Sequence, residues 1–161
     1  MDDVKRILVV SRDTKDCKKA VHYGVSLARK YGAELYVIHV VHDPFSLLGW
    51  NLPIPNLANL EEEFKRLLRE TREELAVTIA AEKKKGMKVN ELVKEGYPAT
   101  EIFQVVKDKR IDLIILLAHE EGRLEHFLFG RSNEEIIRKM PCSILMVKKE
   151  PSPVKVADLK I

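Results

Sequence analysis

A charged loop with two glycines follows the most apolar segment of the chain. Residues 118–135, "AHEEGRLEHFLFGRSNEE", lead from a buried-strand pattern through Gly130 to a helix start. A strand, a glycine turn and a helix N-terminus together form a common phosphate site, because the free N–H groups there point at the anion. Such loops usually keep small residues, but this one carries Glu120, Glu121 and Arg131. The loop therefore has the layout of a phosphate site, with carboxylates that repel a triphosphate.

Histidines at strand ends raise the separate possibility of a metal site. His39 and His42 end one apolar run, and His119 and His126 follow another. No pair has a tight ligand spacing such as H-x3-H, so we expect ordinary polar histidines and no metal. No nucleophile stands beside a base, so we expect no catalytic residues.

The strands and helices that hold the loop and the histidines in place can be read from the hydrophobic pattern. Short apolar runs, typical of buried strands, alternate with segments that repeat apolar residues at the helical period. Strand patterns cover residues 6–11, 33–41, 88–95, 111–118 and 142–149, and helix patterns lie between them, at about 14–31, 59–85, 98–109 and 132–139. Asn59 with Glu62, and Ser132 with Glu135, predict capping boxes at two helix starts. This alternation favours parallel strands with right-handed crossovers, hence an open α/β sheet. Ligands of such sheets bind beyond the carboxyl ends of the strands.

The totals of the chain indicate one soluble domain. The 161 residues are 45% hydrophobic and 33% charged, with a net charge of +3. Basic and acidic residues are interleaved, so we expect no nucleic acid partner. No apolar run approaches the roughly 20 residues of a membrane span, and no signal-peptide pattern opens the chain, so we expect a cytoplasmic protein.

An apolar, proline-containing loop at 42–59 includes Trp50. It either folds onto its own core, covers a site as a lid, or meets another subunit. The sequence leaves the role of residues 44–57 open.

Three blocks of the chain resemble the universal stress protein family over about residues 4–149. The most specific block is "LFGRSNEEIIRKMPCSILMVK", and "KRILVVSRDTKDCKKAVHYGVSLARKYGAELYVIHVV" and "KEGYPATEIFQVVKDKRIDLIILLA" match in length and pattern. The resemblance implies a three-layer, open five-stranded parallel sheet with helices on both faces. This α/β fold is Rossmann-like and adenine nucleotide alpha hydrolase-like, with strand order 3-2-1-4-5. Residues 1–149 are then the domain and residues 150–161 a C-terminal extension.

The ATP-binding members of this family carry G-x2-G-x9-G-(S/T) after the fourth strand and an Asp at the end of the first. Counted back from Gly130, the first two glycines fall on Leu117 and Glu120, and the hydroxyl position falls on Arg131. The Asp position falls on Arg12. This degraded motif predicts a non-enzymatic universal stress protein that is not a typical ATP binder and has no cofactor.

The alternative is an ATP- or nucleotide-binding stress-response switch that uses the loop 118–133. A register slipped by one residue would replace the missing groups by Asp13 and Ser132, with the Val41 backbone against adenine. The residues that could then contact a nucleotide or another anion are Ser11, Arg12, Asp13, Val41, Ala118, His119, Gly122, Arg123, Gly130, Arg131, Ser132 and Asn133. A slow ATPase is the least favoured class.

The last strand is expected at a sheet edge, where an apolar strand invites another chain. The resemblance implies a homodimer paired through this strand, by Ser143, Ile144, Leu145, Met146 and Val147. The tail from Pro151 would wrap the partner or cover the edge of its own chain. A further protein partner is possible, and its identity is unknown.

Overall fold

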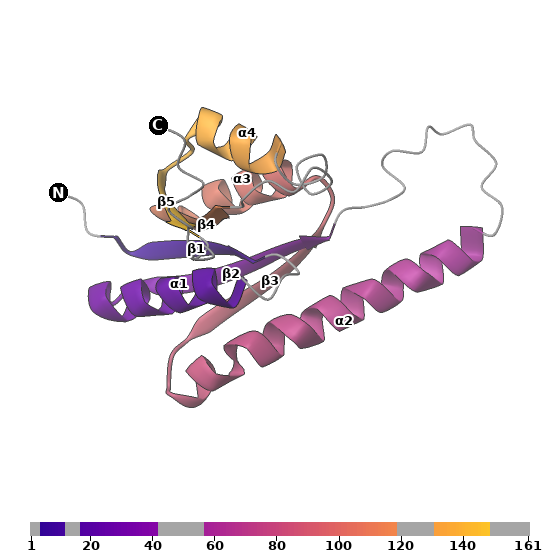
Figure 1. Ribbon diagram of the computed structural model, residues 1–161, viewed down its shortest axis with the longest axis horizontal. Helices are drawn as coiled ribbons and strands as arrows, with labels where there is room; N and C mark the ends of the chain where they lie inside the picture. Colours follow the sequence, from indigo (N-terminus) through magenta and orange to yellow (C-terminus); the bar gives the residue numbers. More distant parts are fainter. Residues whose placement is uncertain (1–3, 12–16, 42–56, 119–130, 149–161) are drawn as a thin grey trace, which may run out of the picture.

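The computed structural model describes residues 4–11, 17–41, 57–118 and 131–148. These residues form alternating strands and helices (Figure 1), which are β1 Arg6–Ser11, α1 Cys17–Tyr31, β2 Glu34–Val41, α2 Leu57–Lys84, β3 Val89–Glu95, α3 Pro98–Lys109, β4 Leu113–Ala118, α4 Arg131–Lys139 and β5 Ser143–Lys148. The predictions for the apolar loop and the C-terminal tail fall outside these residues.

The described strands form one parallel sheet in the order β3-β2-β1-β4-β5. Figure 1 shows α1 and α2 on one face of this sheet and α3 and α4 on the other. The predicted three-layer architecture and strand order are therefore confirmed.

The central strand β1 is buried on both faces. Ile7 and Val9 pack in one apolar cluster with residues of α1 and α2, whereas Leu8 and Val10 pack in a second cluster with residues of α3. A strand covered by helices on both sides has no solvent face, which explains its unbroken apolar run. In α1, Gly24 faces this strand so closely that an added Cβ would lie 2.3 Å from Val9 Cγ2.

Asp112 joins the start of β4 to the start of β1. Its Oδ2 accepts hydrogen bonds from the backbone N–H groups of Lys5 (2.9 Å) and Arg6 (2.7 Å). Its own N–H donates to the carbonyl of Arg6 at 3.0 Å. These bonds place Asp112 before β4, so this strand begins at Leu113 and not at residue 111.

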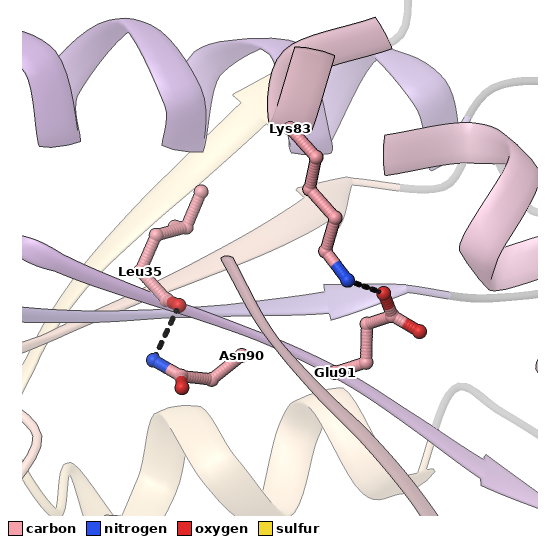
Figure 2. Close-up of polar contacts among 4 residues, drawn as sticks. All are labelled: Leu35, Lys83, Asn90 and Glu91. Atoms are coloured by element: carbon pink, nitrogen blue, oxygen red, sulfur yellow. Dashed lines mark hydrogen bonds and ion pairs between the residues drawn. The ribbon is translucent and has the colours of Figure 1, made fainter. Parts of the chain in front are cut away.

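The edge strand β3 is fastened by polar side chains (Figure 2). Asn90 Nδ2 donates to the carbonyl of Leu35 at 3.2 Å. It also donates to Glu34 Oε1 at 3.2 Å. Lys83 Nζ, in the last turn of α2, pairs with Glu91 Oε1. Charged and amide groups along an edge strand discourage pairing with another chain.

Both predicted capping boxes are wrong. Because α2 begins at Leu57, Asn59 lies inside the helix. Because α4 begins at Arg131, Ser132 is its second residue, and its Oγ bonds to no backbone N–H of the described residues. The pattern of a small polar residue followed by Glu marks a possible cap, but such residues are also tolerated inside a first turn at small cost.

Candidate functional site

The strand order reverses between β1 and β4, and this is where an open α/β sheet offers a ligand site. Register pairs Val9 of β1 with Ile115 of β4, so Ser11 and Ala118 end neighbouring strands at the same carboxyl edge. Ser11 is buried, whereas Ala118 is half-buried. The structure thus brings these two predicted site residues together.

Asn133 attaches the first turn of α4 to this edge. Its Nδ2 donates to the carbonyl of Leu117 at 3.3 Å, the last but one residue of β4. The contact uses a side chain that the alternative hypothesis had assigned to a nucleotide. The bond also ties the start of α4 to the end of β4.

Ser132 lies beside Asn133 but faces the interior. Its side chain is 2% exposed, and among the described residues its Oγ has no hydrogen-bond partner. A buried hydroxyl without a partner costs free energy in the folded state. It also presents no oxygen to solvent, which a contact with a dissolved phosphate requires.

Val41 ends β2, the other neighbour of β1. It is buried, and its carbonyl accepts a hydrogen bond of 3.0 Å from the N–H of Gly96. One of the two Val41 backbone groups available to an adenine is therefore already bonded to the turn after β3.

The remaining predicted site residues lie outside the part of the chain that the structure describes. These are Arg12, Asp13, His119, Gly122, Arg123 and Gly130, together with the side chain of Arg131. Within the residues that the structure does describe, no three His, Cys, Asp or Glu side chains gather to hold a metal ion. In the same residues, no helix combines the length and the apolar character needed to span a bilayer.

The second candidate surface is the free edge of β5. Among the described strands, β5 bonds only to β4, so its outer N–H and C=O groups face away from the sheet. Ser143 and Met146 are exposed, Ile144 and Leu145 are half-buried, and Val147 is buried. Unlike the polar edge of β3, this edge is mainly apolar.

Sequence reasoning missed two exposed apolar residues in and just after α4. Ile137 is 42% exposed in α4, and Met140, which follows the helix, is 65% exposed with a left-handed backbone (φ 39°). The adjacent pair Ile136 and Ile137 could have drawn attention to one of them, because a helix can turn only one of two successive residues fully to the core.

Comparison with known proteins agrees with the sequence resemblance. The family model described as "Universal stress protein family" matches residues 3–148. A universal stress protein of Methanocaldococcus jannaschii is 30% identical over 149 residues, which cover 92% of this chain and 85% of the relative.

Solved structures share the fold. A second Methanocaldococcus jannaschii protein superimposes with a TM-score of 0.74 at 22% identity, over 94% of this chain and 100% of its own. A universal stress protein from Archaeoglobus fulgidus, solved in complex with dAMP, superimposes with a TM-score of 0.60 at 15% identity, over 92% of this chain and 100% of its own.

Proposed function

Because the chain belongs to the universal stress protein family, we propose that it is a non-enzymatic binding protein that works as a homodimer. In this proposal it does not hold ATP by the glycine-rich motif of the family's ATP-binding class. The family match over residues 3–148 also supports a domain of residues 1–149, with residues 150–161 as an extension.

The observation that carries the ATP part of the proposal is the burial of Ser132. With Arg131 in the hydroxyl position of the motif, only a slipped register that uses Ser132 could replace the missing group. The Ser132 side chain is enclosed at 2% exposure, so its Oγ does not face a ligand in solvent. Leu117, in the first glycine position, adds a buried side chain where the motif needs bare backbone.

The homodimer is supported by the contrast between the two sheet edges. The β3 edge is occupied by polar contacts of Asn90 and Glu91, whereas the β5 edge exposes Met146 and open backbone groups. An apolar free edge is a pairing site, and a second identical strand can satisfy it by two-fold symmetry.

A nucleotide-binding switch is the second candidate, and the position of Ser11 and Ala118 at the strand-order reversal favours it. A protein of the same fold has been solved with dAMP, which makes a nucleoside monophosphate the sensible companion to ATP in a test. A monophosphate has fewer charges for the carboxylates Glu120 and Glu121 to repel.

Calorimetry on nucleotide-stripped protein decides between the two candidates. ATP and AMP are titrated with and without magnesium, and native mass spectrometry is run on the protein as purified. The first proposal expects no heat and no bound nucleotide. Binding in the micromolar range would instead establish the switch.

The variant Ser132→Ala tests whether the Ser132 hydroxyl contacts a nucleotide phosphate. If the Ser132 Oγ contacts phosphate, its removal weakens nucleotide binding by roughly tenfold or more. If the hydroxyl is only buried, as the structure has it, Ser132→Ala leaves any binding unchanged and does not destabilise the fold.

A further inference from the structure

Two neighbouring hollows lie near the amino edge of the sheet, away from the carboxyl edge where Ser11 and Ala118 end their strands. One, of about 430 Å³, lies between the turns that follow α1 and α2. The other, of about 410 Å³, lies along α1. Both are open to solvent, and Arg29 and Lys85 line both, so they form one groove. We call it the basic groove and define it by His22, Arg29, Lys30, Lys85 and Lys88.

The pairing of β2 with β3 explains why a groove forms here. The helices that precede these strands each end at a glycine with left-handed backbone, Gly32 (φ 64°) after α1 and Gly86 (φ 80°) after α2. Leu35 of β2 is the register partner of Val89 of β3, so the two turns lie next to each other. A Cβ added to either glycine would meet no atom within 4 Å, which shows that both turns face open space.

The charge of the basic groove is strongly one-sided. Of the described residues that line it, the ones with a formal positive charge are Arg29, Lys30, Lys85 and Lys88, and all of them are exposed. The acidic residue in the same lining is Glu34. Its Oε1 already accepts a hydrogen bond of 3.2 Å from Asn90 Nδ2. The groove therefore presents an excess of positive charge to solvent.

Helix dipoles account for only part of this charge. Two of the cations belong to the last turn of α1, where the negative end of the helix dipole stabilises them. In α2 that role falls to Lys83 and Lys84, and Figure 2 shows Lys83 paired with Glu91 of β3. Lys88 stands directly before β3, beyond the last turn of α2 and thus beyond the reach of its dipole. The groove carries more positive charge than its two helix ends require.

The lining between the cations favours one class of anion. Val25, Ala28 and Met87 add apolar surface to the groove. An acidic peptide matches this mixture, because its carboxylates reach the cations while its methylene groups lie on carbon. No Phe, Tyr or Trp of the described residues lines the groove, so the bases of a nucleic acid would have no such ring on which to stack.

We propose that the basic groove binds an acidic, extended segment of another protein. From His22 to Gly32 the wall formed by α1 is about 15 Å long at a rise of 1.5 Å per residue. An extended segment of about four or five residues spans this length. Carboxylates on successive residues would then face the cations of both walls, and such complementarity gives rate and specificity of association. The groove includes no residue of the candidate nucleotide site or of β5, so this proposal is independent of both.

Fluorescence anisotropy with a labelled hexaglutamate peptide tests the proposal. We expect a dissociation constant below about 1 mM at about 50 mM salt. The affinity should fall severalfold at about 200 mM salt, because exposed charges are screened. If no saturable binding occurs up to about 1 mM peptide at the lower salt concentration, the proposal is wrong.

The double variant Lys85→Glu with Lys88→Glu locates the binding. Its matched control is Lys107→Glu with Lys109→Glu, which changes the net charge equally at exposed residues of α3. Both variants should melt within about 2 °C of the parent, since the altered side chains are exposed. We expect the groove variant to weaken peptide binding by roughly tenfold or more, and the control by less than about twofold. Equal losses would show that net charge alone attracts the peptide, and would overturn the proposal.

Two further measurements separate other occupants from an acidic peptide. A labelled six-nucleotide oligo(dT) is titrated under the same conditions. If it binds more tightly than hexaglutamate and loses that binding in the groove variant, the partner is a nucleic acid and the proposal is overturned. Sedimentation velocity compares the groove variant with its control. If only the groove variant changes its association state, the occupant is a second copy of this chain, which likewise overturns the proposal.

Discussion

Replacing Gly24 by alanine tests whether the fold requires the close approach of α1 to β1 at this residue. An alanine Cβ would lie 2.3 Å from Val9 Cγ2 and 3.3 Å from Leu35 Cδ1. Val9 and Leu35 are fully buried, so neither can turn into solvent. The helix or the strand must then move by roughly an ångström to restore ordinary contact.

The expected cost combines two opposing effects. Alanine is better than glycine inside a helix by about 1 kcal/mol. Overpacking of a core costs typically about 1–3 kcal/mol. With a contact as short as this one, we expect the upper part of that range, hence a net loss of about 1–2 kcal/mol in the free energy of unfolding.

A double-mutant cycle in urea isolates the contact. Val9→Ala removes Cγ2 and by itself creates a cavity that costs roughly 2 kcal/mol. In the double variant the Cβ introduced by Gly24→Ala enters that cavity. The loss of unfolding free energy in the double variant must therefore be smaller than the sum of the two single losses by about 1–3 kcal/mol. Protein concentration is held constant, because dimerisation contributes to apparent stability. Strictly additive costs would refute the packing argument.

Two further predictions concern Asp112 and Cys142. Asp112→Ala leaves the N–H groups of Lys5 and Arg6 without their acceptor and should cost about 1–3 kcal/mol in urea unfolding; a loss below about 0.5 kcal/mol, the usual limit for surface changes, would contradict this. Burial raises the pKa of the Cys142 thiol to about 11 from 9.0, so its alkylation near pH 8, followed by site-resolved mass spectrometry, should be about a hundredfold slower than in unfolded protein. Because the folded protein holds the thiol proton to higher pH than the unfolded protein does, the contribution of this proton to the free energy of unfolding is complete below about pH 9 and is lost as the pH rises to about 11. Equal alkylation rates in folded and unfolded protein would contradict both the slow alkylation and this pH dependence.

The sequence predicted the sheet because its signals are local and redundant. An unbroken apolar run such as "ILVV" at residues 7–10 suits a strand covered on both faces, and alternation with helices leaves few topologies. Glycines at positions 32 and 86 marked two helix ends, and both have positive φ. The capping boxes failed because a polar residue near a helix start does not itself decide which residue is first.

The site was less accessible to sequence reasoning. The spacing around Gly130 indicated a degraded ATP motif, and it left Ser132 open as a replacement. Whether that hydroxyl faces a ligand or the core depends on how α4 is rotated against the sheet. A rotation of α4 by one residue, about 100°, would turn the Ser132 hydroxyl from the core to a ligand. The composition of the loop therefore could not decide which way the hydroxyl points.

By itself, then, the sequence determined the order and type of the elements, the parallel sheet and the family to which the chain belongs, because these follow from hydrophobic period and motif. Only the tertiary structure decided which side chains share a surface. It enclosed Ser132, bonded Asn133 to Leu117, and left Met140 exposed after α4. These contacts join residues from separate elements, and their geometry is set by packing across the whole core, to which no local pattern has access.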